Sequence, residues 1–169
     1  MMPRALSASL AGALLSLTAC GLRPVYAGGS ESAVASTLRS VSVAPIAGQS
    51  GWLMRNKLVD RLGEGGSGSP AYRLDVTIDD NITSFGLRGS QAATRERRTL
   101  RARYRLVDLR NGMVVLDATA GSDAGIDIVS SEYATVAAEQ TALENLADNV
   151  ADQIVARLAL YSSRTAPGR

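Results

Sequence analysis

The segment from Ser131 to Tyr161 constrains the fold of this chain more than any other, because it contains no proline or glycine and is rich in alanine. Such a composition favours a single long helix. Its apolar side chains recur three, four or seven residues apart and form one stripe, whereas the acidic residues mostly lie off it. The stripe consists of Val136, Leu143, Leu146, Val150, Ile154 and Leu158. We therefore expect an amphipathic helix that lies along a sheet.

Four segments upstream of this helix have the pattern of strands. Apolar and polar residues alternate in Leu38 to Ile46, in Tyr72 to Ile82 and in Thr94 to Leu109, and Met113 to about Ala120 returns as the fourth. Pro45 closes the first of them and cannot donate a hydrogen bond to a sheet. We therefore expect that strand at or near an edge.

The segments between the strands predict one further helix and one hairpin. Ser50-Gly51 opens a short helix that ends at Gly63. Its apolar face is formed by Met54, Leu58 and Leu62, each four residues from the next. Asn111-Gly112 predicts a type I′ hairpin turn, because both residues tolerate a positive φ. Residues 121–130 are polar and are expected to form a loop.

The expected fold is α+β, with the element order β-α-β-β-β-α. Two helices cover one face of a mostly antiparallel four-stranded sheet and leave the other face free. We assign this domain to residues 38–161, and residues 162–169 to a disordered tail.

The start of the chain predicts export and a lipid anchor. Arg4 precedes Ala5 to Leu17, a run of Ala, Leu, Ser and Gly that is too short to span a bilayer. Leu17-Thr18-Ala19-Cys20 follows and resembles the bacterial lipobox, in which the cysteine is acylated and becomes the first mature residue. The alternative is an ordinary signal peptide with an unrelated cysteine near its cleavage site.

The lipobox reading divides the start of the chain into two parts. Residues 1–19 would be the signal peptide, and residues 20–37 the lipidated end and a tether. Gly21 stands where an aspartate commonly favours retention in the inner membrane. By that rule we expect an outer-membrane lipoprotein.

Composition argues against catalysis. The chain has no histidine, and its single cysteine is assigned to the lipid anchor, so triads and ordinary zinc sites lack their residues. The glycine-rich segment from Gly63 to Pro70 lacks the Gly-Lys-Ser/Thr ending of a phosphate-binding loop. A formal charge of +2 is too balanced for a nucleic-acid-binding protein. We expect neither a catalytic site, nor a metal site, nor a cofactor.

The third strand has a row of arginines on one face. The candidate binding residues are Arg95, Arg97, Arg101, Arg103 and Arg105, which share one parity of the strand; Arg98 has the other parity. They could form a solvated face whose arginines pair across strands, with Asp75 and Asp79 on one side or with Asp117 on the other. Because arginines outnumber those acids, they could instead bind an anion such as a phosphate-bearing lipid head group, or a protein partner.

Several motifs resemble the LptE family of lipopolysaccharide-assembly lipoproteins. Cys20-Gly21-Leu22-Arg23-Pro24-Val25-Tyr26 resembles the Cys-Gly-Phe-Arg-Pro-Leu-Tyr opening of alphaproteobacterial members, with Leu22 in place of the usual Phe. The other matching segments are Arg55-Asn56-Lys57-Leu58, Tyr72-Arg73-Leu74, Thr94-Arg95, Tyr104-Arg105-Leu106-Val107-Asp108, and Tyr133-Ala134 through Ala137-Ala138-Glu139.

The resemblance implies a function and two partners. Members of this family are anchored in the inner leaflet of the outer membrane and sit within the LptD β-barrel. They act there as plug and assembly factor and bind lipopolysaccharide. On this reading the arginine row contacts either the phosphates of lipopolysaccharide or the barrel wall.

Two other functions compete with this one. An auxiliary lipoprotein of a phospholipid-trafficking ABC transporter can share a lipobox and a mixed α/β layout. A lipid-anchored hydrolase is the third hypothesis, and the absence of histidine argues against it.

Overall fold

The computed structural model describes residues 33–63, 69–87, 93–129 and 131–165. The elements in chain order are α2 (Ala33–Arg39), β1 (Val41–Val43), α3 (Gly48–Leu62), β2 (Tyr72–Leu87), β3 (Ala93–Asp108), β4 (Val114–Asp127) and α4 (Glu132–Thr165). The predicted signal peptide, Cys20, most of the predicted tether, most of the glycine-rich connector and the end of the tail lie outside the described residues.

The sheet has the order β1-β2-β3-β4 and is mixed. β1 runs parallel to β2, whereas β2–β3 and β3–β4 are antiparallel. The predicted α+β class and four-stranded sheet are confirmed, and so is the edge position of the first strand. That strand is much shorter than predicted, because Leu38 belongs to a helix and only Val41 to Val43 pair with β2.

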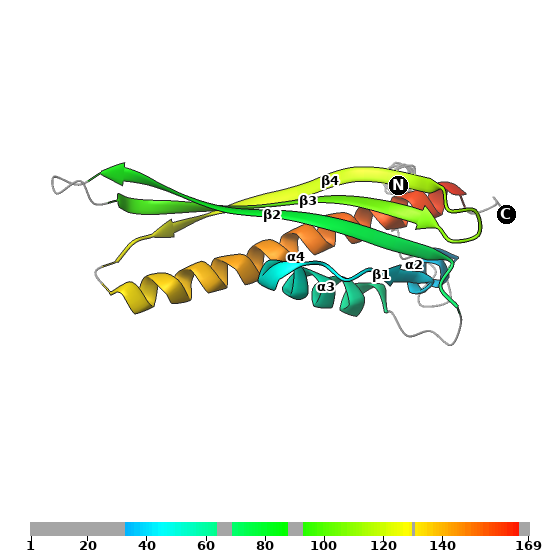
Figure 1. Cartoon of the computed structure of the whole chain (residues 1–169), viewed down its shortest axis with the longest axis horizontal. Helices are drawn as coiled ribbons and strands as arrows, with labels where there is room; N and C mark the ends of the chain where they lie inside the picture. Colours follow the sequence, from blue (N-terminus) through cyan, green and yellow to red (C-terminus); the bar gives the residue numbers. More distant parts are fainter. Residues whose placement is uncertain (1–32, 64–68, 88–92, 130, 166–169) are drawn as a thin grey trace, which may run out of the picture.

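The helices α3 and α4 lie against one face of the sheet, and α4 runs along almost its full length (Figure 1). The core lies between these layers. From α4 it takes Leu143, Leu146, Val150, Ile154 and Leu158, from α3 Met54, Leu58 and Leu62, and from β3 Leu100, Tyr104 and Leu106; all are at most 2% exposed. The predicted apolar faces are therefore confirmed, except that Val136 is 57% exposed.

Helix α2 was not predicted. It occupies residues that we had assigned to the tether and to the first strand, and it packs on α4. Leu38 is buried in the core, and Val34, one turn earlier, packs against the core. A single i, i+4 pair in a segment rich in glycine, serine and alanine is too short a signal to predict a helix.

Strand β4 is longer than predicted. It continues through Asp127, so residues 121–127 are not a loop. Their pairing with β3 is continuous, from Arg101 opposite Gly121 to Arg95 opposite Asp127. The prediction failed because small residues and aspartates hide the alternation here, and only Ile126 reaches the core as a large side chain.

The β3–β4 hairpin forms where Asn111-Gly112 predicted it, but not as a two-residue turn. The Asp108 N–H donates to the Met113 carbonyl (2.9 Å), which leaves a four-residue loop between them. Gly112 has φ 72° and donates its N–H to the Asp108 carbonyl at 2.8 Å. The Asn111 side chain accepts from the Met113 N–H at 2.9 Å. The longer loop places the positive φ at its last residue.

Two groups of ion pairs join the layers. Asp148 on α4 accepts from Lys57 at 3.0 Å and from Arg61 at 2.9 Å, and so ties α4 to α3. Arg98 on β3 faces the helices and binds Asp80 of β2 through two hydrogen bonds of 2.9 and 2.7 Å. It also donates to the carbonyl of Glu139 on α4, at 2.8 Å.

Candidate functional site

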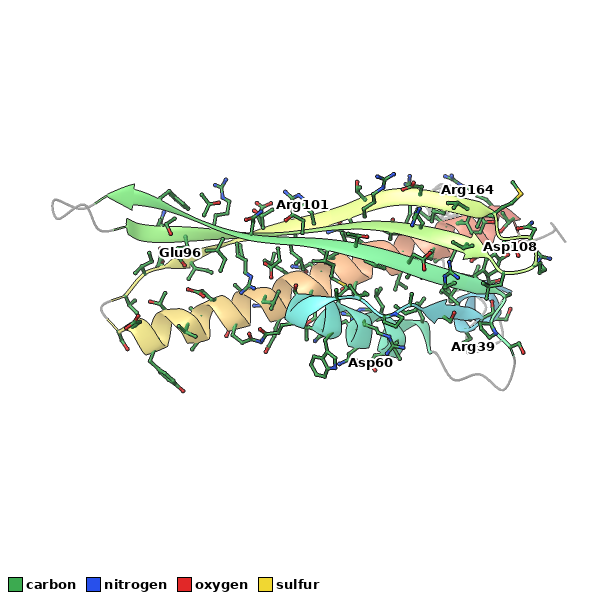
Figure 2. The ribbon with its side chains drawn as sticks, in the orientation of Figure 1. Arg39, Asp60, Glu96, Arg101, Asp108 and Arg164 are labelled. Carbon is green, nitrogen blue, oxygen red and sulfur yellow. The ribbon has the colours of Figure 1, made fainter. Side chains whose placement is uncertain are left out.

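The predicted arginine row lies on the face of the sheet opposite the helices. Its five members are exposed side chains of β3, and they alternate with residues that face the helices. Figure 2 shows Arg101 on this outer side, and Glu96 on the inner side. The outer face is therefore a sheet surface that no described element covers.

Three of the five arginines pair with aspartates of the neighbouring strand β4. The pairs are Arg95 with Asp127 at 2.9 Å, Arg101 with Asp123 at 3.2 Å, and Arg103 with Asp117 at 3.0 Å. The predicted pairing with Asp117 is confirmed. Asp123 and Asp127 were missed, because they lie in the segment that was predicted to be a loop.

The pairing predicted with β2 was wrong. Asp75 lies opposite Arg105 in the register, and Asp79 lies opposite Arg101. The Asp75 carboxylate instead accepts two hydrogen bonds from Arg73, at 2.8 and 3.1 Å. Asp79 accepts from the Asn81 amide at 3.3 Å. Each takes a partner two residues away on its own strand, where the side chains point to the same face.

Electrostatics agrees with the pairing of Arg103 and Asp117. The hydrogen bond from Arg103 lowers the pKa of the Asp117 carboxyl, and the nearby charge of Arg105 acts in the same direction. The same hydrogen bond raises the pKa of Arg103. Both groups are therefore charged over the whole physiological range.

Arg97 and Arg105 differ from the other three. Within the described residues, neither forms an ion pair at 4.0 Å or less. The Arg97 guanidinium lies over the Phe85 ring, 5.6 Å from its centre, which leaves its N–H groups available to an anion. Arg97 and Phe85 line a hollow of about 440 Å³ between the ends of β2, β3 and β4, whereas Arg105 does not. Its floor includes Gly125, where an added Cβ would meet no atom within 4 Å.

A glycine on β4 allows Arg101 to lie across that strand. A Cβ at Gly121 would be 2.5 Å from Cδ of Arg101, so any larger residue would displace the arginine. With glycine at position 121, the Arg101 guanidinium donates hydrogen bonds to the Ser122 carbonyl and to the Asp123 carboxylate, both at 3.2 Å. The backbone of Gly121 is bonded to the side-chain amide of Gln153 on α4. The Gly121 N–H donates to the amide oxygen at 3.3 Å, and the amide nitrogen donates to the Gly121 carbonyl at 3.2 Å.

The outer face is closer to neutral than the sequence indicated. It carries the five arginines and Arg73, against Asp75, Asp79, Asp117, Asp123 and Asp127 among the described residues. The excess of positive charge is therefore one. What distinguishes this face is which arginines have carboxylate partners, rather than its net charge.

In the described part of the chain, no three acidic, cysteine or histidine side chains group closely enough to hold a metal ion. No helix within the same residues is both long and apolar enough to cross a membrane.

Comparison with known proteins gives a family and a fold. Residues 38–158 match the family model LptE, described as lipopolysaccharide-assembly. The structure resembles that of a protein from Caulobacter crescentus CB15 described as a lipoprotein, with a TM-score of 0.65 and 27% identity, over 77% of this chain and 96% of that chain. No curated protein matches the chain.

Two more distant structures share the fold. Rare lipoprotein B from Shewanella oneidensis has a TM-score of 0.57 and 11% identity, over 73% of this chain and 96% of that chain. The minor lipoprotein from Acinetobacter baumannii has a TM-score of 0.56 and 12% identity, over 71% of this chain and 90% of that chain.

Proposed function

The chain belongs to the LptE lipopolysaccharide-assembly family, and from this premise we propose that it is a non-enzymatic outer-membrane lipoprotein. In this proposal it plugs an LptD-like β-barrel, assists assembly of that barrel, and binds lipopolysaccharide for insertion into the outer leaflet. The observation that carries the proposal is the family match over residues 38–158, which includes the whole sheet and most of α4.

The proposed location depends on Cys20. Acylation of this residue would hold the chain in the inner leaflet of the outer membrane, on the periplasmic side, and Gly21 is compatible with that address. Two or more acyl chains anchor a protein stably, whereas one does not.

The arginine row is the proposed binding surface, and its members are not equivalent. Arg95, Arg101 and Arg103 have carboxylate partners, so an incoming phosphate group has to compete with an aspartate. Arg97 and Arg105 do not face that competition among the described residues. They are eight positions apart on β3, or about 27 Å, so one phosphate cannot reach both. We therefore place the first contacts at Arg97 and at Arg105.

Co-purification tests the barrel partner. The lipoprotein should be recovered from detergent-solubilised outer membranes together with a large β-barrel protein, and its depletion should reduce surface lipopolysaccharide. Recovery without a barrel, with lipopolysaccharide export intact, would contradict the proposal. If a phospholipid-trafficking ABC transporter were recovered instead, the chain would be an auxiliary lipoprotein of that transporter.

A matched pair of double variants tests the binding surface. Arg97→Gln/Arg105→Gln removes the two arginines of the row that form no ion pair with another described residue, and Arg101→Gln/Arg103→Gln removes two that form one. We expect the first variant to weaken lipopolysaccharide binding more than the second, at equal loss of charge. Equal effects would contradict the assignment. Normal lipopolysaccharide binding with reduced recovery of the barrel would mean that the row contacts the barrel wall.

A further inference from the structure

Apolar side chains are exposed at the tip of the β3–β4 hairpin. Leu109 is 43% exposed, Met113 63% and Val114 48%. The hairpin backbone is well bonded, so the fold holds these side chains outward on an ordered turn. Three large apolar side chains exposed on one short turn make this tip a candidate contact surface.

Arginines occur in the hairpin and in the last turns of α4. The hairpin and residues 157–165 of α4 contain Arg110, Arg157 and Arg164, against the single acid Asp108. Arg110 binds Asp108 at 2.7 Å but remains largely exposed. Arg157 and Arg164 line a shallow hollow of about 100 Å³ next to Leu160, which is 40% exposed. Apolar residues edged with arginine suit a bilayer surface that carries anionic head groups.

The tip lies at the end of the molecule where the chain enters the domain. The Leu109 N–H donates to the carbonyl of Ala71 at 3.0 Å, and the Ala71 N–H donates to the carbonyl of Ser40, next to α2, at 2.9 Å. Figure 2 shows Arg39, Asp108 and Arg164 together at this end. Tyr133, near the start of α4, lies at the other end, about 40 Å along the helix from Leu160.

Chain length connects this end to the proposed anchor. Thirteen residue steps separate Cys20 from Ala33. They span at most about 45 Å when fully extended. An anchor at Cys20 therefore keeps Ala33, the first residue of α2, within that distance of the membrane.

We propose that the tip formed by Leu109, Met113 and Val114 docks on the phospholipid surface that holds Cys20, with the neighbouring arginines at the phosphate groups. The inference rests on the proposed lipid anchor and goes beyond it. It fixes which end of the domain lies at the leaflet that holds Cys20.

Site-specific labelling of the mature lipidated protein tests the orientation. A polarity-sensitive fluorophore is attached through Met113→Cys or, as the matched control, through Tyr133→Cys, an exposed large side chain at the opposite end. Acylation blocks the thiol of Cys20, so each variant carries one label. The proteins are placed in vesicles of phosphatidylethanolamine and phosphatidylglycerol that contain a lipid-borne quencher.

We expect a blue shift and several-fold stronger quenching at position 113 than at position 133. Equal quenching at the two positions would overturn the proposal. So would an apolar environment at position 113 that develops without vesicles as the protein concentration rises, because a second copy would then cover the tip.

A tagged form separates this result from the anchor. Mass spectrometry shows directly whether Cys20 is acylated. A Cys20→Ser form, held on nickel-chelating lipid by an N-terminal histidine tag, repeats the comparison without acyl chains. Stronger quenching at position 113 in that form would support the docking surface even if Cys20 proved unmodified, and equal quenching would overturn it even if the anchor were correct.

Discussion

Arg98 is the charged residue whose removal we expect to destabilise the fold most. Its side chain is 13% exposed and that of Asp80 is 17% exposed, so the pair is largely removed from water. Arg98→Met deletes two hydrogen bonds to Asp80 and a third to the carbonyl of Glu139. The Asp80 carboxylate is then left in a partly apolar site without its cation.

The expected magnitude lies between two reference cases. Removing one partner of a fully buried ion pair costs about 3–5 kcal/mol, whereas an exposed pair contributes about 0.2–1 kcal/mol. With both side chains less than one-fifth exposed, we expect Arg98→Met to lower the free energy of unfolding by about 3 kcal/mol. With an m-value of about 2 kcal/mol per molar urea, the midpoint of urea unfolding falls by about 1.5 M.

Arg103→Met is the matched control for this prediction. Arg103 also binds an aspartate through two hydrogen bonds, but the side chains of that pair are 68% and 41% exposed. It should cost less than about 1 kcal/mol. The double variant Asp80→Leu/Arg98→Met should recover most of the stability that Arg98→Met loses, because no uncompensated charge remains. Similar losses for Arg98→Met and Arg103→Met, measured by urea unfolding, would refute the reasoning.

Three further predictions concern the two helices and the outer face. Lys57 and Arg61 lower the pKa of the Asp148 carboxyl through hydrogen bonds. The stabilisation that this carboxylate provides is therefore present above its unfolded pKa of about 4, and it is lost as pH falls through the lower folded pKa. Urea unfolding should show Asp148→Asn less stable than the wild type at pH 7, with the difference shrinking below pH 4. Gly121→Ala should displace the flexible end of the Arg101 side chain and cost about 1 kcal/mol in urea unfolding, a loss that Arg101→Ala in the same chain should relieve. Met54→Ala, in a fully buried site on α3, should cost about 2–5 kcal/mol and lower the melting temperature measured by calorimetry.

The buried faces of the helices and strands could be predicted from the sequence, because burial of one face produces the periodic spacing of apolar residues on which the prediction rests. The period of α4 follows its contact with the sheet, and the alternation in β2 and β3 follows the two environments on either side of that sheet. Val136 marks the limit of this reasoning. The helical period continues through it, but a period gives no information on whether a layer is present opposite that turn.

The segments that were mispredicted are held by contacts made elsewhere in the molecule. Residues 121–127 are a strand because β3 is long enough to pair with them, and Gly121 and Gly125 have little strand preference of their own. The partners of the arginines were hidden for the same reason. Asp123 and Asp127 lie beside the arginine row only because residues 121–127 pair with β3. The sequence also does not indicate that Asp75 binds Arg73 rather than Arg105.

The pairing changes what the arginine row can do if it binds phosphate groups. An exposed ion pair is worth only about 0.2–1 kcal/mol, so a ligand that carries several phosphates can take Arg95, Arg101 or Arg103 from its aspartate at little cost. In the free protein the same pairs keep the outer face close to neutral, which limits nonspecific attraction to other anions. A ligand first held at Arg97 or Arg105 can then recruit the paired arginines between them. Binding through such an exchange weakens as salt screens both sets of contacts, and its salt dependence should be smaller in the Arg97→Gln/Arg105→Gln variant than in the wild type.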